Sequence, residues 1–522
     1  LRVTMGNLSE MLPEVTMNVK PPTKDQLLDL AAINHFSVTN EELDDFHDVI
    51  VNLFESYKAL ENMPSFVPTV RYRDRDFGMR PSRNEDPYNA IVRRCKIVGS
   101  GVGKLSGKRI GLKDNICMAG IPITCGSRVL GDYIPDMDAT VVTRLLDAGA
   151  EIVAVLNMDN FAYSGAGNTS AHGPTLNPYN TDYLAGGSSG GSAASLFYDD
   201  IDMTLGGDQG GSIRVPASWS GVVGLKPTYG LVPYTGIVGI GHTFDHAGPL
   251  TLTVADNALM LEVIAGRDPM DPRQNGVYVD TYTKRLEQGV KGLRIGVVAE
   301  GFEQQNAEEN VNESVRLALD QFVSMGAQLS DVSIPEHKNN IPVFFGISFP
   351  ETAAVFQANS LGYGWKGLYN ESLGITLGKQ RRLNGGLLPD TLKVALMVGT
   401  YVNQVGYGGL YFKAQNLRFR WKEVYDKALR QFDILAMPTT PMKAYKHVPN
   451  IDRKQLVSEG WNMLSNTLPF DVTGHPALSI PCGMSDKMPV GLMLVGKEFE
   501  EALLYRVANA FERSVDWRNL SI

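Results

Sequence analysis

The chain has 522 residues, 43% of them hydrophobic and 20% charged, a balance typical of a globular protein with a large core. Its net charge of -9 predicts repulsion from phosphate backbones and anionic membranes, which disfavours a role on nucleic acid or at a membrane surface. The four cysteines form no Cys-x-x-Cys pair, and no signal segment or apolar run of about 18 residues occurs. We therefore expect a cytoplasmic protein with reduced thiols.

Residues 1–70 are expected to form a small α-helical N-terminal domain. Thr23 with Gln26, and Thr39 with Glu42, each fit the capping box that begins a helix. Apolar residues follow both pairs at helical spacing. A packing appendage, a dimerisation element and a substrate-channel element are all compatible with this pattern.

Residues 71–522 are expected to form one α/β catalytic domain, entered through a linker or arm at 66–95. Alternating strand and helix patterns predict a mixed central β-sheet covered by helices. The expected strands are 109–112, 151–156, 203–205, 293–298, 434–437, 477–480 and 491–495, and the expected helices are 139–146, 312–325 and 501–514.

Residues 335–430 are rich in aromatic residues and glycine and show no clear period. Two interpretations stay open for this segment. It forms a cap or a wall of the substrate pocket, or it consists of ordinary helices in the second half of the domain.

Two glycine clusters, at 186–191 and 206–211, stand out from the rest of the chain. Glycine lets a backbone approach a ligand closely, and such loops can direct N–H groups at a negatively charged oxygen. A flexible linker is disfavoured, because both clusters run directly into apolar segments. A phosphate-binding loop is also disfavoured, because no Gly-Lys-Ser/Thr and no Gly-x-Gly-x-x-Gly after a strand is present.

A serine nucleophile within these clusters needs a base, and no histidine lies inside them. His242, His246 and His475 are either pocket residues or, as is more usual, structural histidines with satisfied hydrogen bonds. His-Glu-x-x-His is absent, so the sequence indicates no metal site and no cofactor. Lys113, at the end of an expected buried strand, is the remaining candidate base, although a lone lysine is more often at the surface.

The stretches GLKDNI at 111–116, GGSSGGSAA at 186–194 and GGDQGGSIRVPAS at 206–218 resemble the amidase signature family. Lys113, Ser188 and Ser212 have the spacing of that family's lysine, cis-serine and nucleophile. The resemblance covers roughly residues 75–515. It looks closest to the amidases of bacterial nitrile metabolism, which have Asp-Gln-Gly-Gly-Ser where many members have Asp-Thr-Gly-Gly-Ser, and which carry a helical N-terminal extension.

This resemblance implies the amidase-signature fold and a Ser–cis-Ser–Lys triad. Ser212 attacks the amide carbonyl, and Ser188 relays the proton to Lys113, which burial keeps neutral. The implied oxyanion hole consists of the backbone N–H groups of Gln209, Gly210, Gly211 and Ser212.

The resemblance also implies roles for four further residues. Asp208 and Arg214 flank the nucleophile and are expected to support its glycine loop through ionic hydrogen bonds. Tyr163, where relatives place a pocket aromatic, is expected to contact the substrate, with ordinary packing as the alternative. Ser189 is expected to bind the substrate as an auxiliary hydrogen-bond donor, with helix capping as the alternative.

The implied function is an amidase that hydrolyses the C–N bond of a carboxylic amide to an acid and ammonia or an amine, through an acyl-enzyme on Ser212. Carbamate (urethane) or aryl-acylamide hydrolysis by the same mechanism is an alternative. A transamidation subunit is disfavoured by the Asp-Gln-Gly-Gly-Ser variant, the helical extension and the acidic net charge. A catalytically inactive binding protein is disfavoured by the complete triad. We expect a small-molecule amide or carbamate as substrate, a homodimer, and neither nucleic acid nor membrane as partner.

Overall fold

The computed structural model describes residues 2–4, 19–131 and 133–520. Two compact units are present: Leu8–Thr69 forms one, and Leu1–Asn7 together with Val70–Ile522 forms the other. Each unit is described by itself below.

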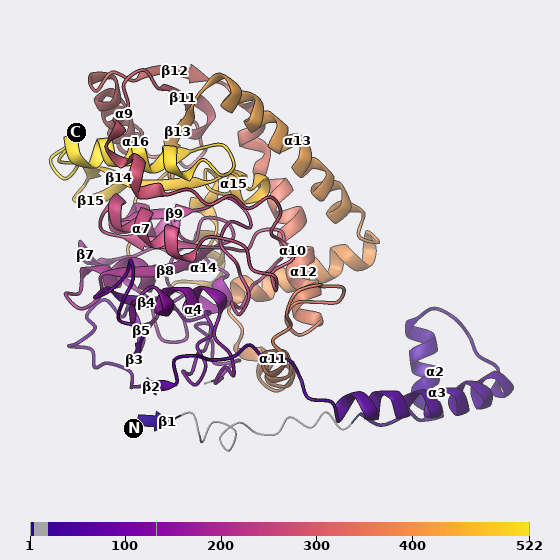
Figure 1. Cartoon of the computed structure of the whole chain (residues 1–522). Helices are drawn as coiled ribbons and strands as arrows, with labels where there is room; N and C mark the ends of the chain where they lie inside the picture. The colour runs from indigo at the N-terminus through magenta and orange to yellow at the C-terminus, as the bar shows by residue number, and fades with distance from the viewer. Residues whose placement is uncertain (1, 5–18, 132, 521–522) are drawn as a thin grey trace. The chain divides into compact units, whose positions relative to one another are not determined.

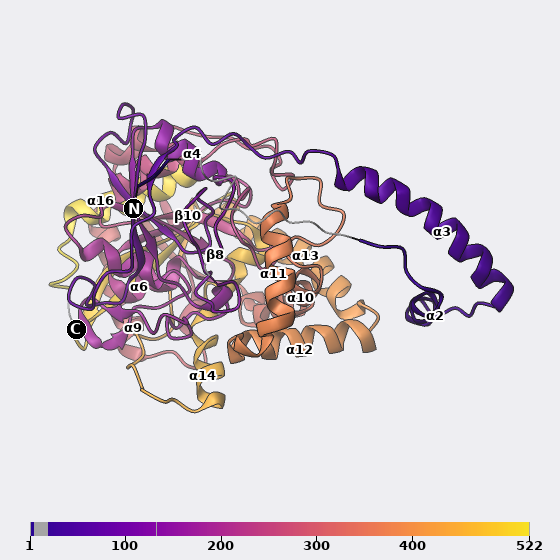
Figure 2. The same ribbon diagram turned by 90° about the horizontal axis from the view of Figure 1, so that it is seen from below.

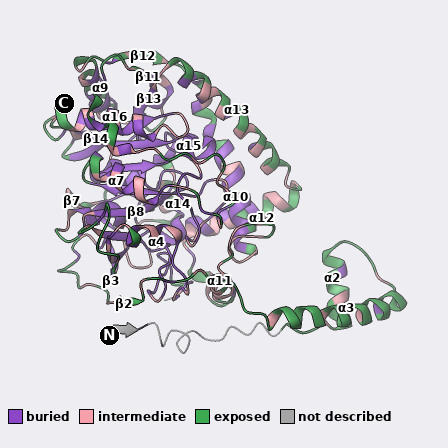
Figure 3. Ribbon diagram, viewed as in Figure 1, coloured by how far each residue is buried: buried purple, intermediate pink, exposed green. Residues whose placement is uncertain are grey.

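The smaller unit contains two helices, α2 (Lys24–Ile33) and α3 (Asn40–Glu61). The capping boxes predicted at Thr23 and Thr39 are confirmed. Each threonine hydroxyl accepts a bond from the backbone N–H of the residue three positions later, and the threonine N–H donates to the side chain of that residue. Most side chains of both helices are exposed to solvent (Figure 3). Their apolar faces therefore have little to pack against within this unit.

The larger unit is built on one mixed sheet of thirteen strands, in the order β1-β2-β3-β5-β4-β8-β10-β9-β14-β15-β13-β11-β12. Helices cover this sheet, and its central strands are the most deeply buried part of the molecule (Figures 1 and 3). The strands are β1 (Arg2–Thr4), β2 (Asp74–Asp76), β3 (Ile91–Val98), β4 (Arg109–Lys113), β5 (Glu151–Leu156), β8 (Met203–Asp208), β9 (Val223–Lys226), β10 (His246–Thr251), β11 (Arg294–Val298), β12 (Gln328–Val332), β13 (Ile434–Pro438), β14 (Ala477–Ser485) and β15 (Met488–Val495), with β6 (Leu176–Asn177) and β7 (Asn180–Leu184) in a separate ribbon.

Helices are interspersed with the strands along much of this unit, as in other α/β folds, but α10 to α13 follow one another without a strand between them. No helix among the described residues is both long and apolar enough to cross a membrane. The α-helices are α4 (Thr140–Asp147), α5 (Gly190–Ala194), α6 (Arg214–Ser220), α7 (Val254–Ile264), α8 (Ala299–Phe302), α9 (Glu309–Ser324), α10 (Asn340–Gln357), α11 (Glu371–Asn384), α12 (Asp390–Val405), α13 (Gly409–Gln431), α14 (Arg453–Glu459), α15 (Leu468–Thr473) and α16 (Glu501–Ser514).

The expected α/β class with a mixed sheet is thus present, and the strand expected at 151–156 has those bounds. The prediction of a linker at 66–95 is wrong, because this segment contains β2 and begins β3. Charged residues inside β3, including Arg93 and Arg94, interrupt the apolar alternation that would have indicated a strand.

Helices α10 to α13, which fill most of the segment 335–430, lie together on one side of the larger unit (Figure 2). Helix α10 is largely buried and packs against α12 and α13. Helix α13, in contrast, is mostly exposed along its outer face (Figure 3). The segment therefore consists mainly of regular helices, of which α10 is the most extensively buried and also contributes to the wall of a pocket.

The sheet brings two distant segments to one edge. Strands β4 and β8 are parallel neighbours, with Leu112 opposite Leu205. Lys113 ends β4, and Asp208 ends β8 just before the turn that leads to Ser212. Because parallel strands end at the same edge, the lysine and the loop after Asp208 emerge side by side.

Candidate active site

Lys113 and Ser188 are in direct contact at this edge of the sheet. Lys113 Nζ donates a 2.7 Å hydrogen bond to Ser188 Oγ and a 3.3 Å bond to the carbonyl oxygen of Gly207. Both side chains are closed to solvent. The peptide bond between Gly187 and Ser188 is cis. The structure therefore brings together two of the three residues predicted for the triad.

Burial lowers the pKa of Lys113 to about 7, against the opposing negative charges of Asp159 and Asp208. Removing an ammonium group from water disfavours its charged form, and this cost exceeds the attraction of the two carboxylates. A large fraction of Lys113 is therefore neutral at physiological pH. A neutral amine is able to accept a proton from the serine hydroxyl that it contacts.

Ser212 follows β8 and the second glycine cluster, and 6% of its surface is exposed. The N–H of Ser189, the residue after Ser188, donates a 3.1 Å bond to the carbonyl oxygen of Ser212. This bond holds the two serine-bearing loops against each other. Ser189 Oγ both donates to the carbonyl of Gly207 and accepts from its N–H, so this hydroxyl is engaged with the backbone.

The turn from Gln209 to Ser212 leaves its N–H groups available. The structure shows no hydrogen bond from these four N–H groups to any other described residue. Gly211 adopts φ = +142°, and a Cβ there would lie 2.4 Å from Thr467 Oγ1, so only glycine fits. Thr467 Oγ1 also donates to the carbonyl of Gly210, which fixes the turn from the opposite side.

Buried ion pairs and hydrogen bonds hold the turn at residues 209–212 in place. Arg214 Nε and Nη2 donate to the two carboxylate oxygens of Asp208 at 3.0 and 2.9 Å, and Nη2 also donates to Asp471 at 2.6 Å. Asp208 in turn accepts the N–H of Ile213 at 3.0 Å. All three charged side chains have no exposed surface. The two flanking residues singled out in the sequence are thus joined by Asp471, which sequence reasoning missed.

The two carboxyl groups of this network titrate in opposite directions. Burial raises the pKa of Asp208, but the charge and hydrogen bonds of Arg214 outweigh it and hold that pKa below its usual range. Burial and the negative charge of Asp208 raise the pKa of Asp471 well above its usual range. Sharing one guanidinium between two carboxyls in a dry site therefore favours a single ionised carboxylate.

The histidines considered from the sequence have structural partners. His246 Nδ1 lies 2.7 Å from the carbonyl of Phe244, and burial, with the charge of Lys226, lowers its pKa well below the usual value. His475 lies between Thr473 and Asp426, at 2.8 and 3.0 Å. His242 Nε2 lies 2.5 Å from the carbonyl of Leu361. These bonds tie all three histidines to groups outside the predicted triad.

Ser212 lines a cavity with a volume of about 40 Å³ that opens to solvent. Tyr163 lines it, whereas Ser189 is not among the lining residues. The Tyr163 hydroxyl contacts Ser348 Oγ at 3.1 Å, and burial raises its pKa to about 12, so that it stays neutral. The lining residues are Ala162, Tyr163, Ser164, Gly165, Gln209, Gly210, Ser212, Ile240, Phe344, Phe345, Ser348, Phe349, Trp461 and Leu464.

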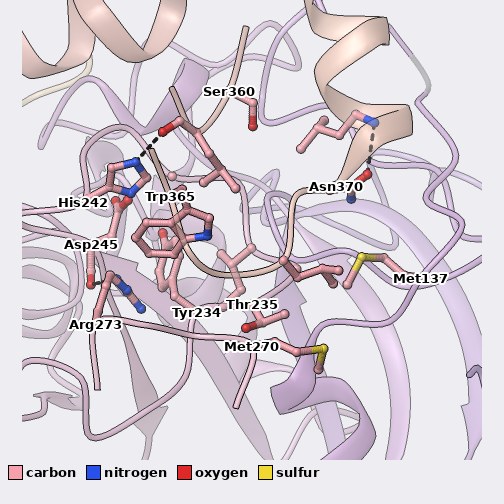
Figure 4. A pocket seen from close by; sticks show the side chains of 16 residues that line it. Met137, Tyr234, Thr235, His242, Asp245, Met270, Arg273, Ser360, Trp365 and Asn370 are labelled. Atoms are coloured by element: carbon pink, nitrogen blue, oxygen red, sulfur yellow. Dashed lines mark hydrogen bonds between the residues drawn. The ribbon is translucent and has the colours of Figure 1, made fainter. Parts of the chain in front are cut away.

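A second cavity, shown in Figure 4, has a volume of about 40 Å³. His242 and Trp365 stack in its wall with ring centroids 4.4 Å apart. Tyr234 also belongs to this wall, and its hydroxyl accepts a 3.0 Å bond from Gln209 Nε2 in the first cavity. The two cavities therefore share a wall at the contact between Tyr234 and Gln209.

Sequence reasoning missed several residues that shape the site. The aromatic residues of α10 belong to a segment without a clear period, and no motif singles out Trp461. Asp159 follows a buried strand, and its N–H donates a 3.2 Å bond to the carbonyl of Ser188. A carboxylate three residues after a buried strand is a signal that could have identified Asp159. No group of three or more His, Cys, Asp or Glu side chains among the described residues is placed to hold a metal ion.

A family model described as Amidase matches residues 86–505. The chain belongs to this amidase family. The sequence resemblance to the family is thereby confirmed, and with it the fold, since solved amidase-signature structures share the mixed sheet covered by helices.

Relatives of this chain include one subunit of an amidotransferase. The glutamyl-tRNA(Gln) amidotransferase subunit of Lysinibacillus sphaericus is 40% identical over 420 residues, which cover 80% of this chain and 84% of the relative. The subunit of the same name from Exiguobacterium sibiricum is 39% identical over 444 residues, covering 84% and 90%.

Solved structures point to the same fold. The corresponding glutamyl-tRNA(Gln) amidotransferase subunit from Thermotoga maritima is 33% identical with a TM-score of 0.69, and the match covers 84% of this chain and 90% of that one. The native peptide amidase of Stenotrophomonas maltophilia is 28% identical with a TM-score of 0.67, covering 83% and 91%. A bacterial aryl acylamidase is 25% identical with a TM-score of 0.68, covering 83% and 91%.

The prediction about partners is wrong. The sequence predicts a small-molecule substrate, a homodimer and no nucleic acid, whereas relatives that are 39–40% identical are named as one subunit of an enzyme for glutamyl-tRNA(Gln). The prediction relied on a net charge averaged over the whole chain. Local charge differs from that average, because the outer face of α13 exposes several cations: Lys413, Arg420, Lys427 and Arg430.

Proposed function

We propose that this amidase cleaves the C–N bond of a carboxylic amide through an acyl-enzyme on Ser212. One observation carries the proposal: the buried Lys113, with a pKa of about 7, donates to Ser188 beside a cavity that Ser212 lines. A hydroxyl nucleophile needs an adjacent base of suitable pKa, and this arrangement supplies one.

In the proposed reaction, Ser212 Oγ attacks the amide carbonyl carbon while its proton passes to Ser188 Oγ and the Ser188 proton passes to Lys113 Nζ. The N–H groups of the Gln209–Ser212 turn stabilise the oxyanion of the tetrahedral intermediate. The proton then returns through Ser188 to the nitrogen, the C–N bond breaks, and ammonia or an amine leaves. Water attacks the ester at Ser212 and releases the acid.

The cavity favours an acyl group that is uncharged and largely apolar. Phe344, Phe349 and Trp461 contribute aromatic surface, and Tyr163 is the one titratable side chain in the lining, held neutral by its raised pKa. A charged group in such a cavity would lose its hydration without gaining a counter-ion. Amides and carbamates with apolar acyl groups therefore fit better than a free amino acid does.

A second candidate function is the amide-cleaving step of a glutamine-dependent amidotransferase. The names of the relatives support it. This function uses the same acyl-enzyme, but the acyl group would be the zwitterionic glutamyl group, and ammonia would go to an acceptor. The apolar cavity does not offer such a group a charged partner.

The two functions can be separated by measuring ammonia release from benzamide, ethyl carbamate and glutamine with the purified chain, and with Ser212→Ala as control. Adding hydroxylamine should give a hydroxamate, because the ester at Ser212 reacts with any small nucleophile that reaches it. We expect benzamide to be cleaved faster than glutamine. Preferential cleavage of glutamine would favour the second function, and undiminished activity of Ser212→Ala would refute the acyl-enzyme.

A further inference from the structure

We propose that the side-chain oxygen of Gln209 accepts a hydrogen bond from an N–H of the substrate's amide group, so that Gln209 selects amides that keep an N–H over esters and disubstituted amides. This inference rests on the proposed function and adds to it. It concerns the side chain of Gln209, whereas the oxyanion-binding role concerns the backbone N–H of the same residue.

The side chain of Gln209 is buried, and within the described part of the chain only the nitrogen end of its amide group forms a hydrogen bond. Only 3% of the residue is exposed. Nε2 donates to the Tyr234 hydroxyl at 3.0 Å, while Oε1 has no hydrogen-bond partner among the described residues. A buried carbonyl oxygen without a donor is unfavourable, and most such groups in proteins are paired. Gln209 therefore presents an unused acceptor in the interior.

The residue that carries this acceptor belongs to the wall of the cavity that contains the nucleophile. Gln209 and Ser212 both line it. The nitrogen end of the side-chain amide is anchored, because Tyr234 is itself fixed: its N–H donates to Asp271 at 2.8 Å, and the Arg273 guanidinium lies 4.8 Å from its ring centre. With Nε2 committed to this rigid tyrosine on one side, Oε1 is directed to the other.

The substrate group that matches an acceptor at this place is the amide nitrogen. An apolar acyl group carries no donor, and the substrate carbonyl is itself an acceptor that the N–H groups of the turn bind. The scissile nitrogen is bonded to the same carbon as that carbonyl oxygen. A side chain that begins at the first residue of the turn is therefore close to it, and pairs its N–H during attack.

The amine of Lys113 does not donate a hydrogen bond to Gln209 Oε1. A Cβ on Gly207 would lie 3.6 Å from Gln209 Nε2 and 3.7 Å from Lys113 Nζ, so both side chains approach Gly207. The hydrogen bonds of Lys113 Nζ go to Ser188 and Gly207, away from Gln209 Oε1. Oε1 is thus left to the substrate.

The test compares two probes with the same acyl group, benzamide and methyl benzoate, in the wild-type enzyme and in Gln209→Met. Methionine has similar length and no hydrogen-bonding amide. Because only benzamide carries an N–H, we expect the ratio of kcat/KM for the amide to kcat/KM for the ester to fall about tenfold in the variant. N,N-dimethylbenzamide should behave like the ester.

Two further variants control for misfolding of Gln209→Met and for a general change in the cavity wall. Gln209→Thr, which introduces the residue of many family members and is too short to reach the amide nitrogen, should lower the same ratio even if Gln209→Met folds poorly. Tyr163→Phe changes a cavity wall that faces the acyl group, and it should alter both probes by the same factor. An unchanged amide-to-ester ratio in both Gln209 variants would overturn the inference.

The outcomes also separate this inference from the proposed function. If Gln209 oriented its nitrogen instead of its oxygen towards the substrate, it would bind the carbonyl, and both probes would lose equally. That result would refute N–H recognition while leaving the acyl-enzyme intact. A wild-type enzyme that forms no hydroxamate from either probe would refute the acyl-enzyme, and with it this inference.

Discussion

Lys113 Nζ lies 2.7 Å from Ser188 Oγ, and neither side chain has any exposed surface. A lysine in water keeps its proton up to a pH of about 10.4 and cannot act as a base at neutral pH. Its burial at the end of β4 removes this obstacle, because the pKa falls to about 7. The position of one residue at a strand end thus decides whether the serine can be activated.

The first prediction concerns pH. Because protonated Lys113 cannot accept the serine proton, kcat/KM should rise about tenfold per pH unit below pH 7 and level off above it. Initial rates of benzamide cleavage between pH 5 and 9 would measure this profile. A rate that is constant down to pH 5 would show that neutral Lys113 is not the base.

The lowered pKa also has a consequence for stability. Between about pH 7 and the unfolded value of about 10.4, the unfolded chain binds a proton at this lysine that the folded chain does not bind. Lys113 therefore makes the free energy of unfolding increase with pH across that window. In Lys113→Met this contribution should be absent, which denaturant titrations at pH 7 and pH 9 can detect.

The second prediction concerns the triad. Ser212→Ala and Lys113→Met should each lower kcat by roughly 10⁴-fold or more, since removing a nucleophile or its base has such effects in related mechanisms. Circular dichroism and thermal unfolding should establish that both variants are folded. The double variant should be hardly slower than either single one, because the groups act as a unit. Additive losses would argue against a shared proton path.

The third prediction concerns the buried network. Arg214→Met leaves Asp208 and Asp471 without their shared cation, and it should lower the free energy of unfolding by about 3–5 kcal/mol. Urea titration measures this change. The matched control is Arg94→Met, which breaks the more exposed pair with Asp200 and should cost less than about 1 kcal/mol. Equal effects would show that burial does not strengthen the role of Arg214.

The fourth prediction concerns the thiols. Cys95, Cys117, Cys125 and Cys482 are buried and unpaired, and burial raises the pKa of each, that of Cys95 to about 12. Iodoacetamide reacts with the thiolate, so the folded enzyme should keep its activity and its mass at about pH 7.5. All four thiols should react in urea. Rapid modification of the folded enzyme with loss of activity would place an accessible thiol at the site.

The sequence predicts those parts of the molecule that depend on neighbours along the chain. The strand at 151–156 and the caps at Thr23 and Thr39 follow from local patterns, and the structure has them where expected. Lys113, Ser188 and Ser212 can be identified because each lies in a long motif. The contact between Lys113 and Ser188 adds that the motifs meet at one edge of the sheet.

The remainder of the site depends on contacts across the fold. Phe344 and Trp461 reach the cavity from elements far from the motifs, and apolar residues occur throughout the chain without marking a pocket. Asp471 acquires its partner Arg214 only in the folded core. Strands β2 and β3, near one end of the sheet, escape prediction because their charged side chains hide the alternation of apolar residues.

The ion pair between Arg214 and Asp471 joins residues 257 positions apart. Thr467, which contacts the carbonyl of Gly210, also comes from this late part of the chain. A growing polypeptide that ends before residue 467 contains every member of the triad but lacks the groups that hold the nucleophile turn. We therefore expect a chain truncated before residue 467 to be inactive, although all three residues of the predicted triad are present.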